Sequence, residues 1–307
     1  MIKIITHNGG FHADDVFAVS TIKLWLEKNE PKNVFGKTKV EVIRTRDMEI
    51  ISKGDFVVDV GGDYDPAKKI FDHHQAGGAG ERTNGIPYSS FGLVWKEYGE
   101  QICGSREIAD VIDQRIVQPI DATDNGVDLC KLIYPDVQPY SISNLIGLCN
   151  FIPNKDKKGS LDGNFLKATI LAKDILEKEI EMSQIEVEEK KYVEEVYDQS
   201  EDKRIIVLEK DVSDDSWGSI LSKYDEPLYI VKPDGKSQNW KLKTVREDTT
   251  SFKSRKDLPS SWAGKTGSDL VKITGIEGSI FCHNKRFIVI AHTKEGAIKL
   301  AQLAVEN

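Results

Sequence analysis

Cysteine is scarce in this sequence, and the residues that occur are far apart. Cys103, Cys130, Cys149 and Cys282 include no Cys-x-x-Cys pair. This spacing argues against a disulfide framework and against a structural zinc knuckle, and it is typical of a protein from a reducing compartment. We therefore expect the four thiols to behave as small, buried apolar side chains.

Long hydrophobic runs are also missing. No stretch approaches the roughly 20 consecutive apolar residues that span a bilayer. The first ten residues, MIKIITHNGG, contain neither the apolar core of a signal peptide nor an Arg- and Ser-rich presequence. The expected location is cytoplasmic, with no membrane partner. The peptidase motifs HExxH and GxSxG are absent as well.

The chain has no excess of positive charge. It carries 42 Lys and Arg against 50 Asp and Glu, a formal net charge of -8. The whole molecule is therefore not an evident nucleic-acid binder, and a polyanionic substrate would need a local basic patch or bound cations. Long duplexes are not expected as substrates. Hydrophobic residues make up 39% of the sequence, which is typical of a globular protein. A chain of 307 residues is long enough for two domains.

The first half of the chain alternates short β-branched runs with amphipathic segments. This order predicts an α/β fold, with a mainly parallel sheet flanked by helices. The expected strands are 2–5, 40–44 and 56–60; the expected helices begin at Asp14-Asp15 and cover 88–99 and 108–120.

The second half predicts a long helix and a smaller α/β domain. Residues 127–163 are irregular, and 164–199 carry one continuous helical pattern. We expect three parts: a metal-binding catalytic domain (1–163), a helical linker (164–199) and a substrate-binding domain (200–307). The last part is predicted to contain strands at 204–208, 228–231, 240–245, 279–283 and 286–290, and a helix at 294–305.

Histidine and aspartate gather where predicted strands give way to loops. Four of the six histidines lie in the first 74 residues. Open parallel sheets bind ligands at the carboxyl ends of their strands, so these side chains are expected to meet. The candidate metal ligands are His7, His12, Asp14, Asp59, His73, His74 and one of Asp121 or Asp124.

Imidazole and carboxylate together suit Mn, Zn, Fe or Co ions. A pair of ions about 3.5–4 Å apart can activate water and stabilise the leaving oxygen of a phosphoryl transfer. Each residue also has a plainer interpretation: His7 and Asp59 as turn residues, and Asp14 as a helix N-cap. Their combination favours metal chemistry. Adjacent His73 and His74 are expected to serve different roles, one on a metal and the other on a substrate phosphate.

Asp72-His73-His74 resembles the signature of the DHH phosphoesterase superfamily. Longer segments resemble the melanocyte-proliferating-gene family, which has been catalogued as uncharacterised or as a "metal-dependent protein hydrolase". The segments are THNGGFHADD (6–15), VDVGGDYDPAKKIFDHHQ (58–75), YSSFGLVWKEYG (88–99), DATDNG (121–126), LPSSW (258–262) and GIEGSIFCH (275–283).

The resemblance implies a DHH-type domain that binds two divalent ions, with Mn²⁺ favoured and Mg²⁺, Co²⁺ or Zn²⁺ as alternatives. It implies a 3'-5' exonuclease acting on RNA or short single-stranded oligonucleotides, with the substrate between the two domains. Asp72, His73 and His74 would be catalytic. His12 stands near the place of an acid in the superfamily pattern, and Asp124-Asn-Gly resembles the superfamily's Asp-Thr-Gly.

Substrate contacts in the second domain are predicted at His283, Arg286, Trp262 and Lys265, with His74 from the first domain. Cations and imidazoles grip phosphate oxygens, and tryptophan stacks on bases. The alternatives are a polar turn at 283–286 and a core position for Trp262. A homodimer is compatible with the sequence. Two other functions stay open: hydrolysis of small phosphoesters, cyclic dinucleotides or pyrophosphate, and a non-enzymatic, metal-stabilised binding protein.

Overall fold

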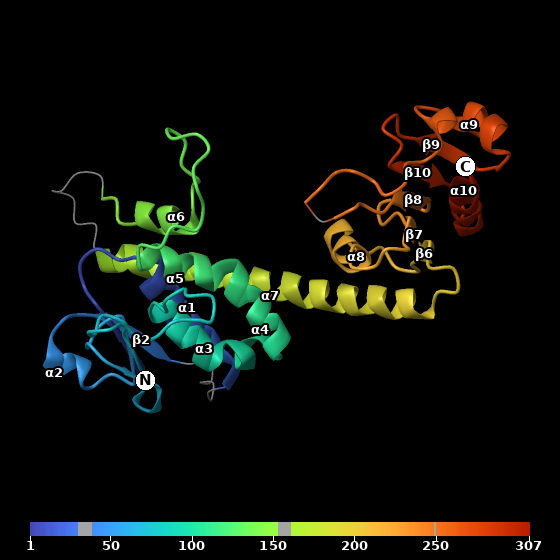
Figure 1. Ribbon diagram of the computed structural model, residues 1–307. Coiled ribbons are helices and arrows are strands. Elements are labelled where there is room, and N and C mark those ends of the chain that lie inside the picture. The colour runs from blue at the N-terminus through green and yellow to red at the C-terminus, as the bar shows by residue number, and fades with distance from the viewer. Residues whose placement is uncertain (30–38, 153–160, 249) are drawn as a thin grey trace. The chain divides into compact units, whose positions relative to one another are not determined.

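The computed structural model describes residues 1–29, 39–152, 161–248 and 250–307. It divides into two compact units, Met1–Ser183 (unit 1) and Gln184–Asn307 (unit 2), each of which is described by itself. The boundary falls inside one helix, α7 (Leu161–Gln199). The predicted α/β class is confirmed, because each unit contains a five-stranded sheet with helices packed on it (Figure 1).

The sheet of unit 1 has the strand order β2-β1-β3-β5-β4. All neighbouring pairs are parallel except β5 with β4. The three predicted strands are confirmed, although β3 ends two residues earlier than expected. Two further strands are only two residues long, too short for alternating hydrophobicity to reveal them. The strands are β1 (Ile2–Thr6), β2 (Val40–Arg44), β3 (Phe56–Val58), β4 (Tyr64–Asp65) and β5 (Ile70–Phe71).

The central helix of unit 1, α1, is buried almost all round. Twelve of its 17 residues are buried, including both acids of its first turn. A helix with apolar residues on every side is a core helix, and α1 packs against both α3 and β3. The helices of this unit are α1 (Ala13–Asn29), α2 (Met48–Ile51), α3 (Ser90–Cys103), α4 (Arg106–Ile112), α5 (Gln118–Asp124) and α6 (Ile142–Leu148), with short helical turns η1 (Pro66–Lys68) and η2 (Asp113–Val117).

Helix boundaries depart from the prediction at three places. α3 passes through Gly99 and ends before Gly104, which adopts a left-handed conformation (φ 82°). The segment predicted as one helix at 108–120 is instead α4, the π-helical turn η2 and α5 in succession. The region expected to be irregular contains α6; its residues 153–160 lie outside the described part of the chain.

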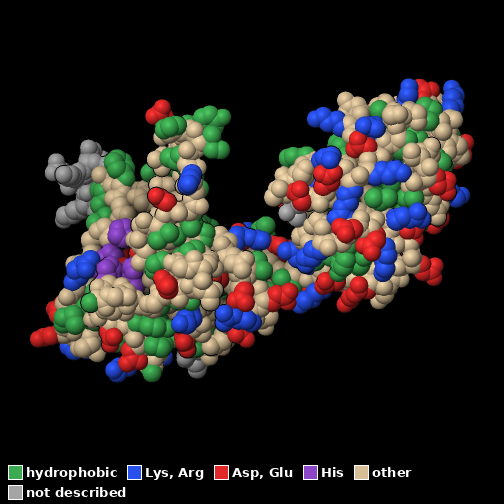
Figure 2. Space-filling model, viewed as in Figure 1, with side chains coloured by type: hydrophobic (Ala, Val, Ile, Leu, Met, Phe, Trp, Pro, Cys, Tyr) green, Lys and Arg blue, Asp and Glu red, His purple; other side chains and the backbone are tan. Residues whose placement is uncertain are grey.

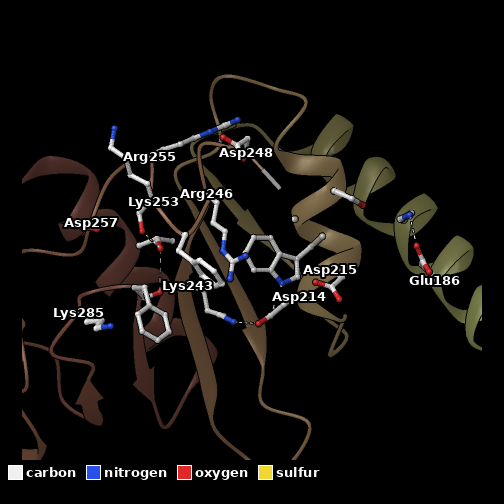
Figure 3. Close-up of a pocket in the computed structure, with 18 residues that line it drawn as sticks. Glu186, Asp214, Asp215, Lys243, Arg246, Asp248, Lys253, Arg255, Asp257 and Lys285 are labelled. Atoms are coloured by element: carbon white, nitrogen blue, oxygen red, sulfur yellow. Dashed lines mark hydrogen bonds and ion pairs between the residues drawn. The ribbon is translucent and has the colours of Figure 1, made fainter. Parts of the chain in front are cut away.

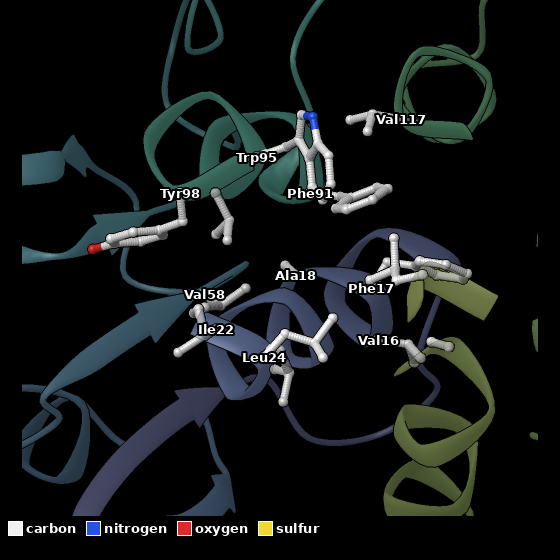
Figure 4. Close-up of a cluster of buried hydrophobic side chains, with 14 of the residues drawn as sticks. Val16, Phe17, Ala18, Ile22, Leu24, Val58, Phe91, Trp95, Tyr98 and Val117 are labelled. Atoms are coloured by element: carbon white, nitrogen blue, oxygen red, sulfur yellow. The ribbon is translucent and has the colours of Figure 1, made fainter. Parts of the chain in front are cut away.

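One apolar cluster holds the layers of unit 1 together. Phe17, Ile22 and Leu24 of α1 belong to the same buried cluster as Phe91 and Trp95 of α3 (Figure 4). All five are buried, with Trp95 still anchored by a hydrogen bond from its Nε1 to Ala109 O at 3.1 Å. Burying such side chains contributes roughly 1.5–3 kcal/mol each. This cluster fixes α1 and α3, whose N-terminal ends carry functional side chains.

The long helix α7 is confirmed, and it does more than link two domains. Phe165 and Ala172 belong to the core of unit 1, whereas Val193 and Tyr197 near its other end belong to a core cluster of unit 2. The apolar residues therefore form a packing stripe at each end of the helix, so that α7 is not a fully solvated linker. In the described part of the chain, no helix has the length and apolar character needed to cross a membrane.

Unit 2 contains a mixed sheet of order β6-β7-β8-β10-β9. The five predicted strands and the final helix are confirmed. Two helices were not predicted, because each is only eight residues long. The elements are β6 (Ile205–Val207), α8 (Asp214–Leu221), β7 (Tyr229–Pro233), β8 (Trp240–Thr244), the short turn η3 (Ser260–Trp262), α9 (Gly267–Thr274), β9 (Ser279–Cys282), β10 (Ile288–Ala291) and α10 (Lys294–Glu306).

The cysteines follow the expectation only in part. Cys103 and Cys282 are buried and free, as expected of small apolar residues. Cys130 is exposed and Cys149 partly exposed, so for these two the prediction of burial is wrong. Both lie in residues 127–151, where few side chains are buried.

Close packing at Gly99 predicts a large effect of adding one methyl group. A Cβ at this position would lie 2.8 Å from Cε2 of the Trp95 ring, which is buried and held by its own hydrogen bond. Gly99→Ala should therefore lower the free energy of unfolding by about 1–3 kcal/mol. Gly163→Ala in α7 is the control, because its Cβ would meet nothing within 4 Å; it should stabilise the protein slightly. Denaturant unfolding of both variants checks this, and equal effects would contradict it.

Candidate metal centre

Histidine and aspartate side chains meet at the carboxyl edge of the sheet in unit 1. His7 follows β1, Asp59 follows β3, and His73 follows β5 closely. Asp14 and Asp15 lie in the first turn of α1, and Asp124 is the last residue of α5. Figure 2 shows histidines gathered in one patch on unit 1. The convergence predicted from strand ends is what the structure shows.

Asp59 lies at the middle of this cluster in an unusual backbone conformation. Its φ is 56°, in the left-handed region that residues other than glycine rarely adopt. Its backbone N donates to Phe71 O at 3.0 Å, which holds the turn after β3. Its carboxylate lies 3.3 Å from His7 Nε2, 3.4 Å from His73 Nε2, and 3.1 Å from Ser90 Oγ, which donates to it.

Three groups of side chains place their ligand atoms within 4.8 Å of one another. Asp59 belongs to two of them, so it is placed as a carboxylate that could bridge two ions. Asp15 was not predicted as a ligand, because the pair Asp14-Asp15 also marks a helix start. The groups are His7-Asp15-Asp59, Asp59-His73-His74 and His12-Asp14-Asp124.

The carboxylate of Asp14 is buried without hydrogen bonds from the described residues to compensate its charge. It is completely buried, and neither oxygen has a hydrogen-bond partner among the described residues. Its nearest ion-pair contact is His73 Nε2, at 3.8 Å. Burial, together with Asp59, Asp124 and Asp15, raises the pKa of Asp14 well above its usual range. A bound cation would satisfy both oxygens and reverse that repulsion, so the residues present fit a divalent-metal site.

The two buried histidines balance these acids with protons. Burial by itself would lower the pKa of His7, but hydrogen bonds to Asp15 and Asp59 outweigh it and raise that pKa to about 10. Burial would also lower the pKa of His73, but its hydrogen bonds to Asp124 and Asp59 outweigh this effect and raise the pKa to about 10. For Asp59, the effect of burial is overcome by hydrogen bonds from His7 and His73, which hold its pKa below the usual range.

Asp72 shapes the turn that carries the histidines. Its Oδ1 accepts from His73 N at 2.8 Å and from His74 N at 3.2 Å, and it lies 2.8 Å from His74 Nδ1. Its Oδ2 accepts from Gly62 N at 2.6 Å. Asp72 is therefore a positioning residue in this structure rather than a group facing the reaction. The side chain of His74 is 62% exposed, which leaves the ring accessible to substrate.

His12 and Asp124 form the outer part of the cluster. The His12 side chain is 69% exposed, and its Nδ1 lies 3.8 Å from Asp124 Oδ1. Asp124 Oδ2 also lies 3.2 Å from His73 Nε2. Of the two acids left open by the sequence, Asp124 is the one that lies among the candidate ligands.

Asp121 is instead held in a separate buried network. Arg82 Nη1 lies 2.7 Å from its Oδ2, and its Oδ1 accepts from Ser89 Oγ at 2.5 Å and from Gly92 N at 3.0 Å. Arg82 also binds Asp113 and packs over the Tyr88 ring. Burial raises the pKa of Asp121 to about 6 although Arg82 and Ser89 favour its charged form. The prediction of Asp121 as a metal ligand is therefore corrected: it anchors the start of α3, where Ser90 reaches Asp59.

A buried arginine holds the loop between β1 and α1. Arg44 donates from Nη2 to Gly9 O at 2.8 Å and pairs with Asp162 at 2.9 Å. Its guanidinium lies over the rings of Phe11 and Phe165, at 5.4 and 4.7 Å from their centroids. The loop that carries His7 and His12 is thereby tied to β2 and α7. Nothing in the sequence around Arg44 signals this role, because its partners come from distant segments.

The residues of unit 2 that were predicted to contact substrate lie in different environments. Trp262 is 2% exposed and belongs to the core, so the prediction that it stacks on a base is corrected. Arg286 pairs with Asp257 at 2.7 Å. The His283 ring lies 4.5 Å from that of Phe287. Lys265 is exposed. Contact between substrate and His283, Arg286 or Lys265 stays a prediction.

A cavity of about 980 Å³ lies within unit 2, between α8 and the segment after β8 (Figure 3). Lys285 and Phe287, from the hairpin that carries His283 and Arg286, form part of its wall. Its charges are mixed: Lys243 pairs with Asp214, whereas the Arg246 guanidinium lies over the exposed Phe252 ring, at 4.7 Å from its centroid. Its lining has five acidic and six basic residues, so the cavity as a whole favours neither sign of charge.

Comparison with known proteins gives consistent results over the whole chain. A family model described as MYG1_exonuc, Uncharacterised protein family (UPF0160), matches residues 3–305. A MYG1 protein of Dictyostelium discoideum is 30% identical, over 98% of this chain and 95% of its own. A MYG1 protein of Schizosaccharomyces pombe is 27% identical (100% and 98%), and the MYG1 exonuclease of Homo sapiens 28% identical (98% and 85%).

One solved structure shows a remote likeness. It is the crystal structure of RecJ in complex with Mg²⁺ from Thermus thermophilus, with 9% identity and a TM-score of 0.29, covering 99% of this chain and 50% of that one. A likeness at this level supports no conclusion about site or fold.

Metal binding should release protons from the centre. Near neutral pH His7 and His73 hold protons, because their pKa values lie at about 10, and only a neutral imidazole binds a metal. Affinity for Mn²⁺ should therefore rise with pH, by about tenfold per pH unit for each proton released. Calorimetric titration in buffers with different ionisation enthalpies measures the protons released. Binding without proton release would contradict the assignment of these histidines as ligands.

Replacing Asp121 should lower the stability of the fold, whereas replacing Asp124 should weaken metal binding. Asp121→Asn leaves buried Arg82 without its full counter-charge and should destabilise the fold by about 3–5 kcal/mol, while the folded protein keeps its metal sites. Asp124→Asn should leave stability nearly unchanged and weaken Mn²⁺ binding. Thermal unfolding and metal titration of both variants check this. The reverse pattern would restore Asp121 as the ligand.

Proposed function

Because the chain belongs to the MYG1_exonuc family, Uncharacterised protein family (UPF0160), we propose that it is a metal-dependent exonuclease that shortens single-stranded RNA from the 3' end. Relatives that match nearly the whole chain carry the name MYG1 exonuclease. The observation that carries the proposal is the convergence of Asp14, Asp15, Asp59 and Asp124 with His7 and His73, with Asp14 left unpaired by hydrogen bonds among the described residues.

The centre has the donors for two divalent ions, and Mn²⁺ fits a mixed set of imidazoles and carboxylates. Bound there, such ions supply an activated water and stabilise charge on the leaving oxygen. The residues around them divide the work. His7, Asp15 and Asp59 would form one ligand set and His12, Asp14 and Asp124 another, with His73 between them.

His74, from the third group, and two residues beside the ligand groups orient the substrate and the centre. We assign the exposed ring of His74, which Asp72 orients, a contact with a phosphate oxygen or with the leaving group. Ser90 fixes Asp59 through its hydroxyl. A single strand suits this chain better than a duplex, because the net charge of -8 opposes broad contact with two phosphate backbones.

The test uses single-stranded RNA labelled at its 5' end, with full-length protein and Mn²⁺. Shortening from the 3' end should give a ladder of labelled products, and a chelator should abolish it. Asp59→Asn should lower kcat by about 100-fold or more, since even partners of metal ligands cost 10- to 100-fold when lost. The control, Asp110→Asn, removes an exposed acid of unit 1 that pairs with Arg106 on the same helix, and it should retain activity.

Intact RNA after incubation with protein shown by metal analysis to be loaded with Mn²⁺ would reject the nuclease proposal. A single labelled mononucleotide, released before any ladder forms, would instead indicate shortening from the 5' end. Turnover of cyclic dinucleotides or pyrophosphate, with RNA unchanged, would keep the metal chemistry and replace the substrate.

A further inference from the structure

Residues 127–151, called here the apolar arm, expose an unusual amount of hydrophobic surface. The arm follows Asp124 closely, includes α6, and stands out from unit 1 in Figure 1. It contains 10 of the 21 large hydrophobic residues that are exposed in the described chain. Ile133 is 87% exposed, Phe151 72% and Tyr134 71%. Figure 2 shows hydrophobic side chains along it.

The charge of the arm argues against a nucleic-acid or anionic-lipid ligand. Its charged residues are Lys131, Asp128 and Asp136, one positive and two negative, which leaves a net charge of -1. Phosphate-bearing partners require several cations. Low charge combined with exposed aliphatic and aromatic side chains is typical instead of the centre of a protein–protein interface.

The exposed area matches what a stable interface needs. The ten side chains are between 37% and 87% exposed. A large aromatic side chain offers about 150–250 Å² and an aliphatic one less, so together they present on the order of 1,000 Å² over all sides of the arm. A standard interface buries about 800 Å² on each partner, and apolar patches beyond a few hundred Å² are rare on proteins that stay monomeric.

Among the described residues, a second arm offers the first more exposed apolar side chains than any other region: the rest of unit 1 exposes seven large hydrophobics, against ten in the arm. Among its described residues, unit 2 exposes only four large hydrophobics, which are far apart in sequence: Ile185, Phe252, Ile273 and Phe287. It therefore offers less apolar surface than the arm. A second copy presents an identical arm at equal concentration, and a patch that pairs with itself gives a closed two-fold dimer.

We propose that the apolar arm is the interface of a homodimer, in which the arm of one copy packs against the arm of a second. This inference does not depend on the proposed nuclease activity.

The arm also adjoins the metal centre at both ends. It starts three residues after Asp124, and Asn150 near its end exchanges two hydrogen bonds with the backbone of Phe11, at 3.0 and 2.7 Å. The dimer interface therefore adjoins the loop that carries His7 and His12.

Sedimentation velocity of the full chain across a wide concentration series tests the proposal. The wild-type protein should sediment as a dimer. The double variant Ile133→Asp/Tyr134→Asp should sediment at half that mass, because two acids per copy would face each other in an apolar contact. Both side chains are exposed, so the Mn²⁺ stoichiometry and the far-ultraviolet circular dichroism of the folded chain should stay as in the wild type.

The matched control is Phe252→Asp, which places an acid at an equally exposed apolar position in unit 2 (88% exposed) and should leave the dimer intact. A wild-type protein that is monomeric at every concentration overturns the proposal, and indicates that the arm is covered within one chain or by a different protein. A dimer that persists in the double variant also overturns it, because the interface would then lie elsewhere.

Discussion

The repulsion among buried carboxylates is the constraint on which the rest of unit 1 depends. Asp14, Asp15 and Asp59 are at most 3% exposed and lie around the same two histidines. Water cannot screen these buried negative charges, so the fold is stable only if bound protons or cations neutralise them. Without a metal, the protons on His7 and His73, whose pKa values lie at about 10, neutralise part of this negative charge. The neutralisation is incomplete, because within the described chain both oxygens of Asp14 have no hydrogen-bond partner.

The scaffold around the centre keeps these acids from moving apart. The left-handed turn at Asp59 is held by Phe71, the turn at His73 by Asp72, and the loop after β1 by Arg44. None of these three supports belongs to the groups of candidate ligands. Asp121 and Asp124 show how finely roles divide: they are three residues apart in α5, yet one is 0% exposed against Arg82 and the other reaches His73.

The two units contribute different chemistry. Unit 1 concentrates acids and imidazoles at a sheet edge, whereas unit 2 offers a cavity of mixed charge with exposed aromatic side chains. α7 has apolar residues in the core of each, so its ends are fixed by packing on both units. The apolar arm adds a third kind of surface, nearly free of charge, that begins beside the metal centre.

The sequence by itself determined the α/β class, the three main strands of unit 1, the long helix and the neighbourhood of the site. These follow from local patterns: β-branched runs, helical spacing, and acids or imidazoles at strand ends. Only the tertiary structure separated Asp124 from Asp121, added Asp15 to the ligands, moved Asp72 to a supporting role and buried Trp262. Each of these depends on which partner lies opposite a side chain. Those partners, such as Arg82 for Asp121, come from distant segments, and no local pattern encodes their distance.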